Sequence, residues 1–401
     1  QRRGGMTLLN TPIEKVEFLL LVAAVLAILA RRLKMPYSVG LVLAGIALSF
    51  LPFPTGIALT KDLVFNAFLP PLIFEAAFHI PWPALRRDFP VVFTLATLGL
   101  VMSAAVTAFG MHMLAGWEWA GAAIFGILIA ATDPVSVIAA FKESGTQGRL
   151  RLLVESESLF NDGTAAVGFS IALALAAGHS VTAFGIATLL LTTVLGGIAC
   201  GALVAGATLL LAGRTHDHLV EITLTTVAAY GSFLLAEHFH MSGVLSTLTT
   251  GLVMGNWGTA GALSAQGRAH LEAFWEYAAF VANSLIFILI GLHEAKQPFM
   301  TALLPAAIAI VLVTLGRAVA IYPCCLLFSG TALRVKAAHQ HVLFWGGLRG
   351  ALALALSLGL PDTLPHREDI ITVVFAVVAF SIFVQATTMP LLLRKNEGRA
   401  K

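Results

Sequence analysis

The chain alternates between long apolar runs and short polar stretches from near Glu14 to Leu393. A helix needs about 20 consecutive apolar residues to cross roughly 30 Å of hydrocarbon, and most of the runs approach or exceed this length. The pattern therefore predicts about thirteen membrane-spanning helices, at 14–33, 36–53, 63–80, 89–115, 118–141, 150–177, 182–213, 218–238, 241–256, 273–292, 300–328, 338–360 and 368–393.

The stretches between these runs contain ordinary loop residues and leave no room for a soluble domain. Examples are LPFPTG at 51–56, HIPWPALRRD at 79–88 and LPDTLPHRED at 360–369, where Pro, Gly and Asp are typical of turns. The first six residues, QRRGGM, lack the apolar region and cleavage site of a signal peptide, so we expect the first helix to be retained.

Composition agrees with this pattern and excludes the soluble globular class. Hydrophobic residues make up 58% of the chain, charged residues 11%, and the mean hydropathy is +0.90. The predicted fold class is an all-α polytopic membrane protein. The three cysteines fall inside apolar runs, which indicates neither a disulfide framework nor a zinc site; they are Cys200, Cys324 and Cys325.

Most of the 24 lysines and arginines fall in one set of alternate loops. Because basic residues collect on the cytoplasmic side, we expect the N-terminus outside and the C-terminus in the cytoplasm. Residues 1–13 are then an extracytoplasmic tail and residues 395–401 a short cytoplasmic tail. Basic loops facing anionic lipid explain the net charge of +3, so no nucleic acid partner is invoked.

A few ionisable residues fall inside the apolar runs. An ionised side chain at mid-bilayer costs about 2.5–3.5 kcal/mol or more, so each of them needs a partner or a function. The deeply placed ones are Glu75, Asp133, Glu157, Asp162, Arg317 and Arg349, with Glu155 one turn nearer the cytoplasmic end.

The segment VESESLFNDG at 154–163 carries two polar faces. Glu157 and Asn161 are four residues apart and share one helix face, while Ser158 and Asp162 share the next. The first face suits a buried arginine, and either Arg317 or Arg349 is an acceptable partner for Glu157. Replacing Arg349 with Ala is expected to destabilise the protein by leaving Glu157 unpaired.

The four deepest acids outnumber the two intramembrane arginines. A surplus of buried negative charge requires a cation, a proton or water to neutralise it. A carboxylate that must hold either a hard cation or a proton is a device for exchanging one for the other.

Two predicted helices carry interruptions at similar depth. Pro134 in AATDPVSV removes a helical hydrogen bond and frees carbonyls such as that of Thr132, and three glycines surround Arg349 in FWGGLRGAL. Seven spans separate the two segments, so they run in opposite directions. Interrupted helices at matching positions in inverted halves indicate a midplane site in a secondary transporter.

Three short motifs in the chain resemble those of a known family. TDP at 132–134, ESLFND at 157–162 and WGGLRGA at 345–351 resemble the signature segments of the monovalent cation:proton antiporter family, which includes bacterial NhaP-type antiporters and mammalian sodium/proton exchangers. The resemblance covers about residues 14–394. It implies two inverted repeats with two crossed interrupted helices, and a homodimer working by an elevator-like movement in the plasma (bacterial inner) membrane.

The resemblance also implies a division of the chain. The dimerisation part is expected at roughly 14–80 and 218–292, the core part at roughly 89–177 and 300–393, and a linker helix at 182–213.

By the same resemblance, Asp162 binds the cation and the proton, and Asp133, Ser158 and Thr132 complete a sodium site, with Glu75 in support. Glu157 and Asn161 resemble the residues that engage a core arginine, here Arg317 or Arg349. The Asn-Asp form at 161–162 is similar to the electroneutral branch, which exchanges one cation for one proton in pH homeostasis. Sodium, lithium or potassium and protons are the transported ions, and no cofactor is expected.

Alternatives remain open at this point. A potassium/proton antiporter of the same fold fits equally, since selectivity depends on cavity size and ligand number. Glu75 follows Leu-Pro-Pro and is either a cap at a proline kink or a carboxylate on the ion's path. A membrane enzyme is disfavoured because HExxH, GxSxG and Walker A patterns are absent, which also disfavours a nucleotide partner. A channel would favour a repeated carbonyl filter or rings of charge.

Overall fold

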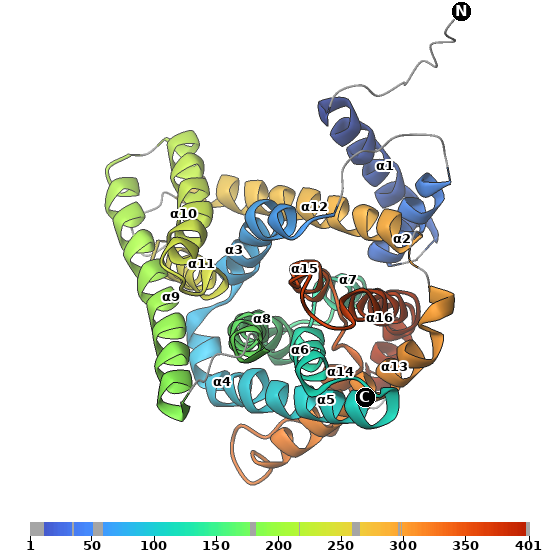
Figure 1. Cartoon of the computed structure of the whole chain (residues 1–401). Coiled ribbons are helices and arrows are strands. Elements are labelled where there is room, and N and C mark those ends of the chain that lie inside the picture. The colour runs from blue at the N-terminus through green and yellow to red at the C-terminus, as the bar shows by residue number, and fades with distance from the viewer. Residues whose placement is uncertain are drawn as a thin grey trace, which may run out of the picture.

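The computed structural model describes residues 12–33, 36–50, 59–176, 182–215, 217–258, 265–295, 297 and 299–397. In these ranges the regular structure is helical throughout (Figure 1). Most of the two predicted tails lies outside the described residues. Residues 12–13 begin the first helix and residues 395–397 continue the last one, and the division into tails and a membrane domain stays a prediction.

The helices are α1 (Pro12–Leu33), α2 (Tyr37–Ser49), η1 (Leu63–Phe68), α3 (Leu69–His79), α4 (Trp82–Thr94), η2 (Leu95–Gly99), α5 (Leu100–Ala115), α6 (Trp119–Ala130), α7 (Val135–Ser144), α8 (Arg149–Ala176), α9 (Ala183–Ala212), α10 (His218–His238), α11 (Gly243–Trp257), α12 (Ala265–Glu294), η4 (Phe299–Thr301), α13 (Leu303–Leu326), α14 (Ala337–Trp345), α15 (Ala351–Leu358), α16 (Arg367–Phe380), η5 (Ser381–Ala386) and α17 (Thr387–Glu397). The π-helical turns η1, η2 and η5 continue into the α-helices that follow them.

The predicted polytopic all-α fold is confirmed, because every predicted segment coincides with one helix or one interrupted pair of helices. Among the residues described, eight helices are long and apolar enough to cross a membrane, and Tyr37–Ser49 and Leu63–His79 are shorter apolar helices. The segment at 118–141 divides into α6 and α7, and the segment at 338–360 divides into α14 and α15.

Two predicted boundaries were wrong. The stretch HIPWPALRRD reads as a loop, but α4 begins at Trp82 because prolines are acceptable before and within a first helical turn. Its Asp88 is fully buried and accepts bonds from Arg87 and Arg149. Helix α12 begins at Ala265, eight residues before the predicted 273, in a polar first part that holds an Arg268–Glu272 pair.

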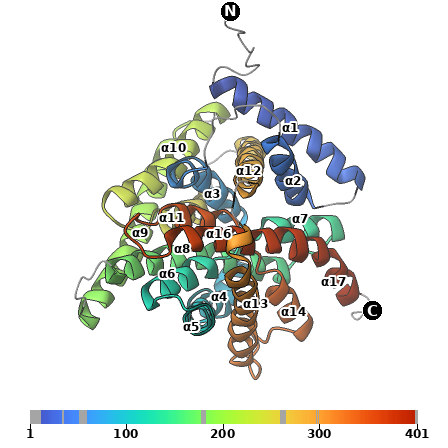
Figure 2. The same cartoon turned by 45° about the vertical axis from the view of Figure 1, so that its right-hand side comes forward.

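The helices pack into two groups, seen in Figure 1 around the central helices. In the first group α2 lies on α12, α3 on α11, and α9 along α10 and α11. In the second group α5 lies on α6 and α13, and α16 on α13 and α15. Figure 2 shows α2 beside α12, with α1 along the outside. The interrupted helices belong to the second group.

The two interruptions cross each other. Residues 131–134 and 347–350 leave the helical conformation, and the Asp133 N–H donates a 2.8 Å hydrogen bond to the Leu348 carbonyl. Four half-helix ends therefore meet inside the second group, where unpaired backbone groups need partners that lipid cannot provide. The candidate site residues described below lie at this crossing or on helices next to it.

Candidate functional site at the helix crossing

Thr132 ties the first interruption to α8. Its N–H donates to Asn161 Oδ1 at 3.1 Å, and its hydroxyl lies 2.9 Å from that of Ser158. The Asn161 amide returns a hydrogen bond of 2.6 Å to Thr132 Oγ1. All three side chains are buried, so this network fixes the extended segment against α8 and satisfies polar groups that would otherwise be costly.

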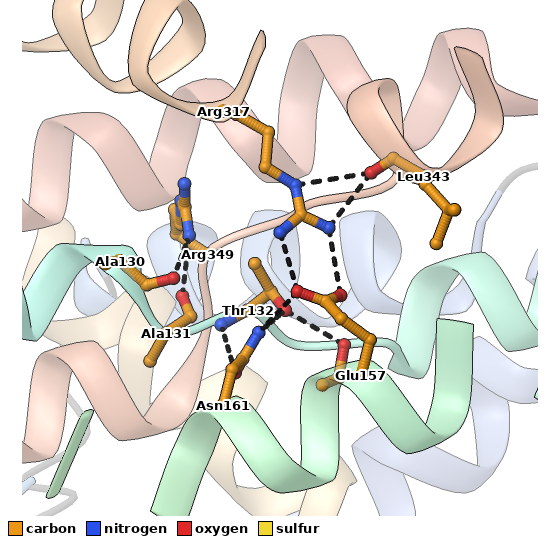
Figure 3. A network of polar contacts seen from close by, with 9 residues as sticks. Ala130, Ala131, Thr132, Glu157, Asn161, Arg317, Leu343 and Arg349 are labelled. Carbon is orange, nitrogen blue, oxygen red and sulfur yellow. Dashed lines mark hydrogen bonds and ion pairs between the residues drawn. The ribbon is translucent and has the colours of Figure 1, made fainter. Parts of the chain in front are cut away.

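Glu157 pairs with Arg317 (Figure 3). Two guanidinium nitrogens donate to the two carboxylate oxygens at 2.7 and 2.9 Å, and Asn161 adds a bond of 3.0 Å. Arg317 also donates to the Leu343 carbonyl near the end of α14. Of the two arginines left open by the sequence, Arg317 is the partner of Glu157, with the two-pronged geometry that guanidinium groups favour.

Arg349 does not pair with Glu157, although the predicted effect of its removal assumed that it does. It donates to the carbonyls of Ala130 and Ala131 at 2.6 and 3.0 Å, and it pairs with no carboxylate among the residues described. These carbonyls lie at the C-terminal end of α6, where the helix dipole is negative. The expectation was wrong because helix ends, as well as acids, compete for a buried arginine.

Asp133 lies at the opposite kind of helix end. Its Oδ1 accepts a 2.9 Å hydrogen bond from the Val135 N–H at the start of α7, where the dipole favours negative charge. The backbone of Gly350, just before α15, approaches so closely that a Cβ there would overlap the Asp133 carboxylate. Helix ends therefore balance the charges of both Asp133 and Arg349, which a count of acids and arginines does not reveal.

A cavity of about 100 Å³ brings the remaining polar groups together. Its walls include Asp162, Asp133, Thr132 and Glu75, with apolar residues of α3, α7, α8 and α15 between them. Asp162 has no hydrogen-bond or ion-pair partner in the part of the chain that the structure describes. Ser158 does not line the cavity, but its hydroxyl contacts that of Thr132, which does. The arrangement offers carboxylate and hydroxyl oxygens to a small cation, the ligands that hard cations prefer.

The comparisons with known proteins agree with the fold. Residues 19–395 match the family model of the transmembrane sodium/hydrogen exchanger. The chain belongs to this sodium/hydrogen exchanger family. It is similar to the low-affinity Na⁺/H⁺ antiporter NhaS1 of Synechocystis, with 38% identity over 90% of this chain and 69% of the relative.

Two further comparisons of this exchanger-family chain cover nearly the whole of each partner protein. It is 33% identical to the Na⁺/H⁺ antiporter NhaH of Halobacillus aidingensis, over 95% of this chain and 97% of that protein. The structure of the sodium proton antiporter MjNhaP1 from Methanocaldococcus jannaschii matches with a TM-score of 0.75 at 20% identity, over 96% of this chain and 99% of the other. This last likeness supports the fold.

Glu75 of this exchanger-family chain lies on α3, one turn after the Leu-Pro-Pro stretch, and it lines the cavity. The side chain is 27% exposed, and Oε1 lies 3.4 Å from His79 Nδ1, one turn further along α3. His79 Nδ1 also lies 2.8 Å from the Glu75 carbonyl. Glu75 therefore has a titratable side chain, that of His79, as a close neighbour on its own helix.

Asn283 is a cavity residue that the sequence argument missed. It lies on α12, in the first group of helices, and faces the cavity opposite the residues of the crossing. A signal was present, because Asn283 is an amide within the apolar stretch FVANSLIFILIGL. Unlike Asn161, Asn283 lies beside no acid in the sequence, but a neutral amide inside a span also needs partners there.

Proposed function

We propose that this chain is a secondary active transporter that exchanges one sodium or lithium ion for one proton at Asp162, without net charge movement. Support comes from its family membership and from relatives named as Na⁺/H⁺ antiporters. Potassium in place of sodium would preserve the mechanism and change only the substrate.

The observation that carries the proposal is the unpartnered Asp162 carboxylate on the wall of a small cavity. Glu157 is neutralised by Arg317, and Asp133 lies at a helix N-terminus, so Asp162 is the acid that a mobile positive charge must balance. In the proposed cycle it binds a cation with Asp133 and Thr132, and Ser158 holds Thr132 in place. After release it returns with a proton, as buried carboxylates favour the neutral form.

Glu157, Asn161, Arg317 and Arg349 hold the crossing together and do not bind the ion in this proposal. Their contacts fix α8, α13 and α14 and the ends of α6, so the ligands keep their geometry as the site changes the side it faces. Glu75 supports the cation from α3.

The movement that we propose is of the core relative to the remainder. The core is roughly 89–177 and 300–393, the dimerisation part roughly 14–80 and 218–292, and α9 is the linker. We further propose a homodimer in a plasma or bacterial inner membrane, with the N-terminus outside, because most basic loop residues then face the cytoplasm.

The test is proton flux into liposomes that contain the purified protein, followed with a pH-sensitive dye. Sodium, lithium, potassium or choline is added while the membrane potential is clamped. Wild type is compared with Asp162→Asn and with the matched control Asp362→Asn, whose side chain is 96% exposed. We expect flux with sodium or lithium in wild type and the control, independent of potential, and none in Asp162→Asn.

Flux driven by potassium alone would change the substrate. Flux that follows the potential would contradict one-for-one exchange. Sodium-driven proton flux that persists in a folded Asp162→Asn variant would contradict the role given to Asp162.

A further inference from the structure

A second, much larger cavity lies between the two groups of helices, away from the candidate ion site. Its volume is about 960 Å³, near the upper end of the roughly 300–1,000 Å³ typical of ligand pockets. The walls come from α4, η2, α5, α6 and α8 on one side and from α9 and α11 on the other, and they are almost wholly apolar. Representative side chains are Phe89, Phe93, Val101, Phe160, Leu190 and Ile198.

The cavity opens on a surface that faces hydrocarbon. Phe93 is 51% exposed, Val101 58% and Leu190 44%, and all three lie on helices long and apolar enough to cross a membrane. Apolar surface of this kind is compatible with lipid chains, and water gains nothing by filling it, since the walls offer it few hydrogen bonds. An occupant must therefore be mainly apolar along its length.

A positive charge lies on α4 one turn before the first residue that lines the cavity. Arg86 precedes Phe89 by three residues and Phe93 by seven on α4, so the three side chains share one helix face. Arg86 is exposed and has no ion-pair partner among the described residues.

The next residues do not cancel this charge. Arg87 and Arg149 both bind the single carboxylate of the buried Asp88, so this cluster keeps an excess positive charge beside Arg86. An occupant with a long apolar part and one anionic end fits both features.

We propose that an anionic phospholipid of the bilayer binds here, with its acyl chains in the cavity between α9 and the helices α4, α5, α6 and α8, and its phosphate at Arg86. Guanidinium groups bind phosphate strongly, and a basic residue at a membrane surface contributes about 1 kcal/mol towards anionic lipid. Acyl chains are flexible enough to fill an irregular space. The proposal does not depend on what the protein transports.

The experiment measures lipid retention by native mass spectrometry. Purified protein is mixed with phosphatidylglycerol or phosphatidylcholine of identical acyl chains. Two variants fill the cavity, Ala105→Trp and Val101→Trp, both at exposed positions on its wall. Arg86→Ala removes the charge. The matched controls are Ala307→Trp, exposed on α13 outside this cavity, and Arg214→Ala, an exposed arginine that follows α9 and does not line the cavity.

We expect wild type and both controls to retain phosphatidylglycerol over phosphatidylcholine. Arg86→Ala should lower that preference about fivefold, the equivalent of ~1 kcal/mol, and at least one folded tryptophan variant should lose both lipids. Equal retention of the two lipids by wild type would overturn the proposal. So would unchanged retention by both tryptophan variants, or an unchanged preference in Arg86→Ala. Lipid retention is read without any flux measurement, so failure here is separate from failure of the exchange proposal.

Discussion

Asn161 and Asp162 are neighbours on α8, yet their surroundings differ completely. Asn161 is buried and bonded to Thr132 and Glu157, whereas Asp162 faces a cavity without a partner. The difference arises from the helical turn of about 100° per residue, which places successive side chains on different faces. One position therefore stabilises the crossing while the next remains available to an ion.

The two intramembrane arginines should differ in their effect on stability. Arg317→Ala leaves Glu157 buried without its guanidinium, and breaking a buried pair costs about 3–5 kcal/mol. Arg349→Ala removes hydrogen bonds to two carbonyls but strands no carboxylate, so its loss should be smaller. The measurement is the temperature at which the purified variants lose their folded fraction in detergent.

A second substitution separates the two roles. Glu157→Gln should recover part of the stability lost in Arg317→Ala, because the stranded charge is removed. The same change should give no recovery in the Arg349→Ala background. Equal recovery in both backgrounds would show that Arg349 also depends on Glu157, contrary to the contacts described.

At the scale of the elements, the sequence predicted both interruptions but not how their ends are satisfied. Pro134 and the glycines around Arg349 are strong local signals. The partners of the ends are set by which helices cross, and this information lies in residues far apart in the chain. Arg317 and Glu157 are 160 positions apart, and only the fold, in which α14 contacts both α13 and α8, brings them together.

The boundary of α4 and the role of Asn283 illustrate the same limit. Residues 79–88 have the composition of a loop, but the buried Asp88 gains two arginine partners that stabilise a helix there. Asn283 is an ordinary neutral residue until the fold places it beside the acids of the crossing. Hydropathy determines where helices lie in a membrane protein and carries little information on which polar groups share a cavity.

The approach of the two interrupted helices should depend on one glycine. In Gly350→Ala the new methyl group would overlap the Asp133 carboxylate, so the crossing must shift. We expect a marked loss of sodium-driven proton flux, measured in liposomes with equal amounts of folded protein.

The matched control for this change is Gly206→Ala on α9, where no described atom beyond the helix's own nearby backbone and the adjacent residues lies within 4 Å of the added group. Alanine favours a helix more than glycine does, so flux and stability should be preserved. Comparable loss of flux in both variants would refute the role assigned to the crossing.

At the scale of the whole molecule, an ion pair on the surface joins the two groups of helices. Lys142 at the end of α7 lies 3.2 Å from Glu276 on α12. Both side chains are more than half exposed, so the pair itself contributes little stability, about 0–1 kcal/mol. Lys142 and Glu276 are, however, two positions that must separate if the core moves as proposed.

Linking these positions should therefore stop exchange. Cysteines at both positions, joined by a thiol-specific crosslinker, are expected to abolish sodium-driven proton flux. Each single-cysteine variant treated in the same way is the control and should remain active. A crosslinked protein with full activity would mean that α7 and α12 do not separate during the cycle.

The balance of charge at the crossing also has an electrical consequence. Glu157 and Arg317 neutralise each other, and Asp133 and Arg349 carry opposite charges at helix ends. With either a sodium ion or a proton on Asp162, the proposed moving unit then carries no net charge at its centre. A membrane voltage does about 2.3 kcal/mol of work per elementary charge for each 100 mV. On a neutral unit that work vanishes, so an energised membrane would neither accelerate nor oppose the passage of the loaded site.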